Sequence, residues 1–459
     1  MKRAIRLKIV RSQLTIQGTS DSLELVASVS KSYILFLTGI LALFSASARA
    51  QSYGYSGSLA VDGAQHLLNP STPASEKLQL KFQQKGKFDR NWSGVLEGHG
   101  WIEGVYAGSD EYPKASRDQD LYEARFQNAY IKWQDGPWDV RVGNQQQMWG
   151  ETFASGVADI VNPKDLRFGI PMDPSRTTLA TPMVSLKYIG EALSVQALYI
   201  IQPMFNILPL PGEDFFPKFP DNPTVKQFRI LRERELPMSG GNGEYGLRLS
   251  GTFAGADVSV FGMNYFDRNP YYIMDNLDAS TQTLSLRERH ARVTSEGLSF
   301  AAPVGESGFM LRGEGLYTAA RSVNILARDY SLTAKEVSEF AGSATLEFPP
   351  WRKLNFAMQY QQSQFVEWAK YVSRKNQDVE YVSARVALGL FESSTWATIL
   401  TWSIGDSGYR VLSDFTSPIS NSTEFSLGTE IFGGNSSSDF SQIQRASRVY
   451  VQLRFFFSG

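Results

Sequence analysis

The polarity of the side chains in this chain alternates with a period of two over many short segments. In residues 448–455, Val449, Val451, Leu453 and Phe455 are separated by charged or polar residues, and residues 77–83 and 353–361 show the same alternation. A period of two is typical of a β-strand that has one apolar face and one face exposed to water. Because the pattern recurs along most of the chain, the sequence predicts an all-β protein.

Short turns and long loops alternate between these segments. Short turns are expected at residues 86–91, 135–137, 190–191, 254–255, 303–306, 349–350 and 392–393, and longer loops at about 107–120, 147–181, 202–242, 267–289, 320–337 and 366–377. Bacterial outer-membrane barrels have short turns on one side and long outward-facing loops on the other. We therefore expect a transmembrane antiparallel up-and-down β-barrel. A soluble β-protein would need a second sheet layer, which the patterning does not indicate.

The strand count follows from parity. Both ends of such a barrel lie on the periplasmic side, so the number of strands is even. Residues 409–416 and 423–432 are both extended in pattern, with a Pro/Ser/Asn turn at 417–422, and counting both gives eighteen strands. If residues 406–446 form one outer loop, the count is sixteen. Eighteen strands enclose a cylinder wide enough for an aqueous channel.

The first fifty residues have the pattern of a secretory signal peptide. Basic residues precede an apolar run at 33–44, and Ala48, Arg49 and Ala50 form an A-x-A cleavage site. The run is shorter than the roughly 20 apolar residues that span a bilayer. We expect residues 1–50 to be removed and residues 51–459 to form an outer-membrane barrel. A translation start downstream of Met1 stays open.

Composition excludes several function classes. The chain has no cysteine, which excludes disulfides and thiolate sites, and its formal net charge of −1 gives it no attraction for nucleic acid. The three histidines are His66, His99 and His290. His99 lies near Glu97 and Glu103, but no nucleophile motif or H-E-x-x-H pattern accompanies it. We therefore expect no enzymatic activity, no metal and no cofactor.

Charged residues fall on the strand face opposite the apolar one. That face is predicted to line the lumen with Arg125, Asp139, Arg141, Arg248, Arg312, Glu314 and Arg385. Opposed charges across a water-filled pore select permeants by charge and size. The alternative is that each charge bonds to a neighbouring strand and merely keeps the lumen wet.

Two outer loops have unusual content. The third, residues 147–181, carries six apolar residues that need burial, and its position is the one that folds inward as a constriction in general porins; these residues are Val157, Ile160, Val161, Leu166, Phe168 and Ile170. The fourth, residues 202–242, mixes aromatic residues with prolines, which favours a lid or an apolar vestibule and hints at apolar or amphipathic permeants. Either loop could instead pack on itself over the barrel mouth.

A motif across the third loop carries a resemblance to a known family. Arg141, Gly143 and Gln145, then Trp149-Gly150-Glu151, then Asn162-Pro163-Lys164-Asp165-Leu166 resemble the R-x-G-x-Q, W-G-E and N-P-x-D-L elements of a largely uncharacterised family of proteobacterial outer-membrane porin-like β-barrels. The resemblance implies that Arg141, Gln145, Trp149 and Asp165 organise an inner loop. Glu151 and Asn162 belong to the same motif. One departure is that the chain continues past Phe457 with Ser458 and Gly459, whereas such barrels usually finish on Phe.

These observations favour a passive outer-membrane channel for small solutes. The expected partners are outer-membrane lipid, a small-molecule permeant and the outer-membrane assembly machinery. An exporter or scaffold component for polysaccharide or hydrophobic compounds is the second hypothesis, because some related barrels look like exporters. A lipid-modifying enzyme of the outer membrane is the third. The sequence leaves open the permeant, the oligomeric state and whether loops plug the pore.

Overall fold

The computed structural model describes residues 52–107, 112–153, 156–218, 225–326, 332–367, 377–391 and 393–459. The predicted signal peptide, residues 1–50, lies outside the described residues and stays a prediction. Among the helices that the structure describes, none has both the length and the apolarity needed to cross a bilayer.

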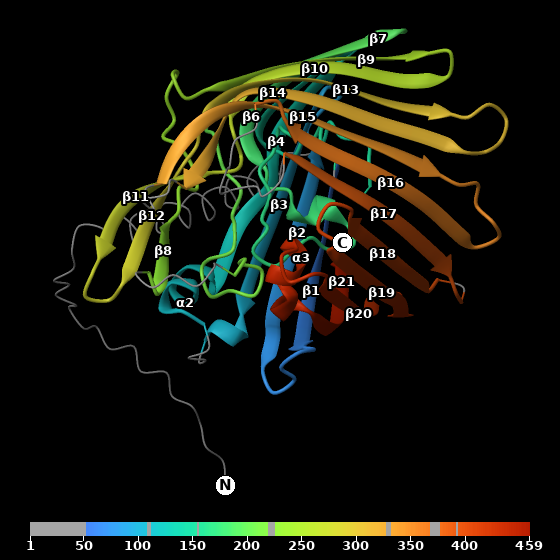
Figure 1. Cartoon of the computed structure of the whole chain (residues 1–459). Helices are drawn as coiled ribbons and strands as arrows, with labels where there is room; N and C mark the ends of the chain where they lie inside the picture. The colour runs from blue at the N-terminus through green and yellow to red at the C-terminus, as the bar shows by residue number, and fades with distance from the viewer. Residues whose placement is uncertain are drawn as a thin grey trace, which may run out of the picture. The chain divides into compact units, whose positions relative to one another are not determined.

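Eighteen antiparallel strands form one closed sheet, which confirms the predicted barrel and its strand count; the alternative of sixteen is wrong (Figure 1). The strands of the barrel are β1 (Ser52–His66), β2 (Pro73–Lys87), β3 (Trp92–Glu103), β4 (Tyr122–Asp135), β5 (Trp138–Gln145), β6 (Thr181–Ile189), β7 (Leu193–Ile200), β9 (Glu244–Phe253), β10 (Ala256–Phe266), β13 (Arg292–Pro303), β14 (Met310–Leu326), β15 (Leu332–Glu347), β16 (Leu354–Phe365), β17 (Asp378–Gly389), β18 (Thr395–Ser403), β19 (Tyr409–Ser420), β20 (Thr423–Gly433) and β21 (Arg448–Ser458).

The barrel closes where β1 pairs with β21. The register runs from Ser56 opposite Ser458 to His66 opposite Arg448, and Tyr55 and Gly459 exchange backbone hydrogen bonds beyond it. Each strand otherwise pairs with its neighbours along the chain, as an up-and-down barrel requires. The two residues after Phe457 therefore continue the closing strand.

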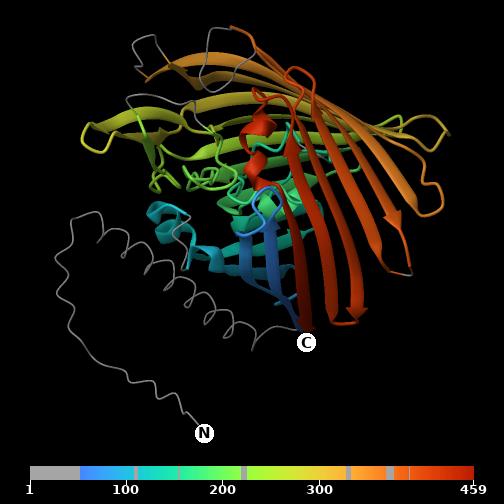
Figure 2. The same cartoon turned by 60° about the horizontal axis from the view of Figure 1, so that its bottom comes forward.

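The remaining elements lie in the long loops, which gather with them at one end of the barrel, while hairpin turns close the other (Figures 1 and 2). A three-stranded sheet has the order β11 (Tyr271–Asp278), β12 (Thr283–Arg289) and β8 (Gln227–Leu231), with β8 parallel to β12. The short helices are η1 (Gly104–Tyr106), α2 (Lys114–Asp120), η2 (Pro174–Thr177), α3 (Asp439–Gln442) and η3 (Gln444–Ala446).

Several predicted connections contain strand; residues 267–289, expected as a loop, hold β11 and β12. Residues 320–337 were expected as a loop, but β14 and β15 stay paired from Arg321 opposite Val337 to Leu326 opposite Leu332. A bulge with Ala320 at φ 58° breaks the alternation there, which is why the pattern looks like a strand end. The turn expected at 417–422 is likewise shorter, because β19 continues to Ser420.

Side-chain exposure separates the two faces of the barrel wall as predicted. The outward positions Leu78, Leu80, Met358 and Tyr360 are exposed large hydrophobic residues, whereas Gln359, between Met358 and Tyr360, is buried on the other face. Apolar side chains that face outward match a lipid environment, and the polar face lines the interior.

Candidate functional site

The hairpin of β4 and β5 leads directly into the third outer loop, residues 146–180, which we call L3. Gly143 in β5 has φ of 131°, and a Cβ there would lie 2.2 Å from the carbonyl oxygen of Ala129 on β4. The glycine of the R-x-G-x-Q element is therefore required by close strand pairing. Gln145, which ends β5, is buried and donates a hydrogen bond from Nε2 to the carbonyl oxygen of Met183, 3.0 Å away.

Asn162 joins the start and the end of L3. Its Oδ1 accepts a hydrogen bond from the backbone N–H of Gln147 at 2.6 Å. Its Nδ2 donates to the carbonyl oxygens of Gln145 and Leu179 at 2.9 and 2.8 Å, and to Oγ1 of Thr181 at 3.1 Å. The side chain therefore divides L3 into a first lobe, residues 146–162, and a second lobe, residues 163–180.

A carboxylate of the barrel wall anchors the first lobe. Glu314 of β14 accepts backbone hydrogen bonds from Glu151, Thr152 and Ala158, with lengths between 2.5 and 3.0 Å. Within the lobe, Asp159 accepts hydrogen bonds from the backbone of Trp149 and Gly150. Backbone donors that converge on a buried carboxylate form strong, charge-assisted bonds, so Glu314 fixes where the lobe lies.

Apolar contacts hold the same lobe against the wall. Trp149 is 1% exposed and packs on Phe261 of β10, with ring centroids 5.3 Å apart. It belongs to a buried cluster formed by L3 residues and side chains of β6, β7, β10, β13 and β14; the cluster includes Ala158, Ile160, Val161, Met183, Leu198, Ile200, Met263, Tyr265, Val293 and Leu316. The apolar residues of the first lobe thus pack on the inner face of the barrel wall.

The second lobe is held by a buried ionic cluster. Arg167 is 2% exposed and contacts three carboxylates: Asp120 at 2.6 Å, Glu123 at 2.5 Å and Asp165 at 2.7 Å. Arg125 of β4 adds a contact to Asp165 at 3.1 Å. Burial alone would raise the pKa of Asp165, but the guanidinium groups of Arg167 and Arg125 hold this pKa well below its usual range. The lobe therefore depends on fully paired buried charges.

The tip of the second lobe reaches the wall near the barrel closure. The carbonyl oxygens of Phe168 and Ile170 accept hydrogen bonds from Arg448 of β21 and Arg410 of β19. Phe168 also packs edge-on against Trp101 of β3. Ile170 is 36% exposed, so the expectation that it needs burial is wrong: its neighbourhood is fixed through its backbone carbonyl instead.

The fourth outer loop, residues 201–243 (L4), packs against L3. Ile207 pairs with Asp165 in a parallel bridge, and Arg232 contacts Asp120 at 3.1 Å. The aromatic and aliphatic residues of L4 are buried by other contacts: Phe205 stacks on His290 with a centroid distance of 3.4 Å, and Leu210 and Phe216 form a buried cluster with Ile230. Phe219 lies outside the described residues.

Glu213 of L4 is a buried acid at this loop interface. Burial and the negative charge of Asp120 raise the pKa of Glu213 to about 8. Its Oε2 accepts from the backbone N–H of Leu210, whereas Oε1 is buried without a hydrogen-bond partner among the described residues. A proton on Oε1 would supply a donor toward Asp120.

We expect the stability of the barrel to fall as pH rises from about 4.5 to 8, because over this range the folded state keeps a proton on Glu213 that the unfolded chain has lost. Glu213→Gln is neutral at every pH and should therefore remove this contribution to the dependence of stability on pH. Thermal unfolding midpoints of both proteins at pH 5.5 and 8.5 measure it. Equal slopes for the two proteins would show that Glu213 is ionised throughout.

The remaining predicted site residues lie at three separate places. Glu151 of L3 contacts Arg248 of β9 at 3.6 Å and Arg312 of β14 at 3.4 Å. Arg141 makes its hydrogen bonds to Asp139 on its own strand, three residues from the hairpin turn. Arg385 is exposed on β17 and has no ion-pair or hydrogen-bond partner among the described residues.

The structure also shows a histidine–carboxylate pair that the sequence does not reveal. His66 Nε2 lies 2.9 Å from Asp214 of L4, and its Nδ1 lies 3.1 Å from Thr72 Oγ1. The partners are 148 residues apart, so no local motif signals the pair. His99, which the sequence placed near carboxylates, instead lies 3.4 Å from Gln79 Oε1. His66 thus links the connection between β1 and β2, residues 67–72, to L4.

A family profile described as "Protein of unknown function (DUF1302)" matches residues 17–454. The chain belongs to the DUF1302 family. Among curated proteins, no sequence matches it. The R-x-G-x-Q, W-G-E and N-P-x-D-L pattern is not itself tested by this match.

Solved structures similar to this DUF1302 member are outer-membrane barrels. Acinetobacter baumannii OccAB1 has a TM-score of 0.51 at 9% identity, and the comparison covers 90% of this chain and 97% of that chain. The outer membrane protein opdK from Pseudomonas aeruginosa has a TM-score of 0.50 at 8% identity, covering 89% and 100%. Acinetobacter baumannii OccAB2 has a TM-score of 0.50 at 10% identity, and the comparison covers 89% of this chain and 98% of that chain. At these identities the likeness shows a porin-type barrel fold.

Proposed function

We propose that this barrel is an outer-membrane channel through which small solutes diffuse passively and that L3 forms its constriction. The observation that carries the proposal is the anchoring of L3: one lobe is bound by Glu314 of β14, and the other by Arg410 of β19 and Arg448 of β21. An eighteen-strand barrel is too wide for wall side chains alone to fill. A loop fixed to two parts of the wall narrows such a lumen and leaves a passage beside it.

We place the passage between L3 and the wall formed by β16 to β18. The described hydrogen bonds of L3 to the wall go to strands on either side of β16–β18, with Ser343 of β15 contacting Thr152 at 3.4 Å. The inner face of the wall carries small or polar side chains such as Ser383, Ala387 and Ala397. Exposed Arg385 gives this face a positive charge without a paired carboxylate.

Arg385→Ala is expected to lower the anion-to-cation permeability ratio by about twofold or more, because an unpaired charge on the passage wall acts directly on passing ions. Arg141→Ala is the matched control, since Arg141 is neutralised by Asp139 at 2.9 Å and Lys132 also contacts that carboxylate. Reversal potentials in a salt gradient measure both variants. An equal or larger change for Arg141→Ala would place the passage elsewhere.

Liposome swelling tests the proposed function. Vesicles with the purified barrel should swell in isotonic solutions of small neutral sugars and more slowly as the sugar grows. Vesicles that contain folded barrel and do not swell with any solute would overturn passive diffusion and favour the exporter or scaffold alternative.

A further inference from the structure

One short segment of L4, residues 213–216, lies where three other connections of the barrel meet. Arg445 of η3, in the connection between β20 and β21, donates hydrogen bonds to three backbone carbonyl oxygens of the segment, those of Glu213, Asp214 and Phe216. Tyr112, in the connection between β3 and β4, donates from its hydroxyl to Asp214 Oδ2 at 3.1 Å. His66, the last residue of β1, contacts the same carboxylate oxygen at 2.9 Å. One imidazole ring therefore ties L4 to the β1–β2 connection.

Both ring nitrogens of His66 face atoms that accept hydrogen bonds. Nε2 faces the carboxylate of Asp214, and Nδ1 lies 3.1 Å from both the carbonyl oxygen and Oγ1 of Thr72. The Thr72 hydroxyl donates its hydrogen to the carbonyl oxygen of Asn69 at 3.2 Å, so Oγ1 is an acceptor toward the ring as well. A neutral imidazole has one N–H, whereas an imidazolium has two. These contacts are those of a doubly protonated, cationic ring.

The other charged groups around the ring have partners of their own. His66 is 8% exposed. Arg448, opposite His66 in the ladder between β1 and β21, pairs with Glu430 at 3.0 Å. The side chain of Glu213 accepts a hydrogen bond from the backbone of its own loop, and burial raises its pKa to about 8. Asp214 is therefore the carboxylate that balances the charge of His66 in the part of the chain that the structure describes.

Loss of one proton from this ring would break the pattern of contacts. A histidine ring ordinarily loses its second proton near pH 6.5, whereas a carboxylate is ionised above about pH 4. The neutral ring directs a lone pair at either Asp214 or Thr72, so one hydrogen bond is lost, and the charge attraction to Asp214 ends. The complete set of contacts is thus present at low pH and is lost as pH rises. Arg445 and Tyr112 keep their bonds to residues 213–216, so the segment loosens and does not detach.

We propose that His66 and Asp214 form a pH-sensitive latch, which holds L4 to the β1–β2 connection while the ring is doubly protonated and loosens it when one proton leaves. L4 packs on L3 through the bridge between Ile207 and Asp165, so the latch acts on the loop beside the proposed constriction. The loosening of L4 does not depend on the proposed function, but its effect on ionic current rests on it.

Hydrogen–deuterium exchange of the purified barrel in detergent, read by mass spectrometry on peptides that cover residues 210–218, tests the latch. Rates are expressed relative to the unfolded chain at the same pH. We expect relative exchange in wild type to be about tenfold faster at pH 8.5 than at pH 5.5, because one charge-assisted hydrogen bond is lost. His66→Gln and Asp214→Asn should each show the fast rate at both pH values.

Two variants serve as controls for other titrating groups. The ring of His99 has a hydrogen bond to Gln79 in place of a carboxylate, so His99→Gln should keep the wild-type difference. Glu213→Gln removes the second titrating side chain of the segment and should also keep it. Equal relative exchange at both pH values in wild type, an undiminished difference in His66→Gln, or a difference that vanishes in Glu213→Gln would overturn the latch.

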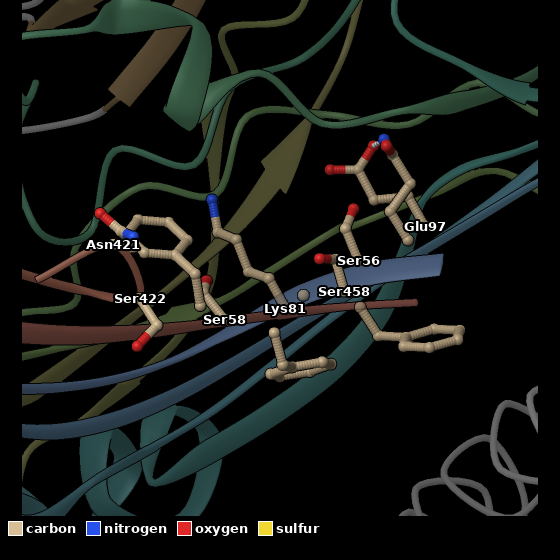
Figure 3. A pocket seen from close by; sticks show the side chains of 12 residues that line it. Ser56, Ser58, Lys81, Glu97, Asn421, Ser422 and Ser458 are labelled. Carbon is tan, nitrogen blue, oxygen red and sulfur yellow. Dashed lines mark hydrogen bonds between the residues drawn. The ribbon is translucent and has the colours of Figure 1, made fainter. Parts of the chain in front are cut away.

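Planar-bilayer recordings measure the effect of the latch on the current. The wild-type current should be noisier at pH 8.5 than at pH 5.5, and that of His66→Gln equally noisy at both. Figure 3 shows two other titratable side chains, Lys81 and Glu97, which extend to the same side of the strands at a cavity of about 560 Å³ near the start of β1, whereas His66 ends this strand. Lys81→Gln should keep the wild-type response. If exchange responds through His66 but the barrel stays electrically silent, the channel is wrong; if the barrel conducts but exchange does not respond, the latch is wrong.

Discussion

Arg167→Leu is expected to lower the free energy of unfolding by about 3–5 kcal/mol, the usual consequence of removing one partner from a buried ion cluster. Asp120, Glu123 and Asp165 would each lose their contact with the buried guanidinium. Arg125 still contacts Glu123 and Asp165, and Arg232 still contacts Asp120, so each of the three carboxylates keeps a partner but loses the most buried one. Urea unfolding of the barrel in vesicles, followed by tryptophan fluorescence, measures the loss.

Arg287→Leu is the matched control for this change. Arg287 pairs with Asp275 at 2.9 Å, but both side chains are more than one-third exposed, so the pair contributes about 1 kcal/mol or less. A loss at Arg167 no larger than that at Arg287 would show that the second lobe of L3 does not depend on its ionic cluster.

Glu314→Ala is expected to increase the single-channel conductance about twofold or more and to make the current noisier. The substitution removes the acceptor for the backbone of Glu151, Thr152 and Ala158, and each unsatisfied buried donor costs about 1–3 kcal/mol. The first lobe then leaves the wall or exchanges between positions, although Trp149 still favours its place there. Recordings in planar bilayers measure both the size and the noise of the current.

Glu347→Ala is the control for Glu314→Ala. Glu347 lies on the neighbouring strand β15 and pairs with Arg312 at 2.8 Å. Its removal changes the charge of the lumen by the same amount and leaves the three backbone bonds of L3 in place. If Glu347→Ala enlarges the current as much as Glu314→Ala, the effect comes from charge, and the anchoring role of Glu314 is wrong.

The barrel was predictable from the sequence because the alternation of apolar and polar residues is a signal within each strand. Leu78, Leu80 and Val451 alternate with polar residues, and this period of two fixes which side of the wall each residue faces. The rule that such a barrel has an even number of strands then favoured two strands, β19 and β20, where the pattern was ambiguous. The alternation pattern gave a wrong prediction at the bulge of Ala320, because one extra residue reverses which side the following residues face.

The partners of the charged lumen residues were not predictable. Glu314 binds backbone more than 150 residues away, and Asp214 meets His66 across 148 residues. The pattern placed Glu314 on the inner face without indicating what it binds. Arg167, at the centre of the ionic cluster, carried no signal beyond its place next to the N-P-x-D-L element.

Single-channel recording of the wild-type barrel in a planar bilayer tests the central claim most directly. An eighteen-strand barrel narrowed by an anchored L3 should give steady openings of uniform size, with a current proportional to salt concentration. Folded, inserted barrel that stays electrically silent would contradict the account, because the loops would then seal the lumen.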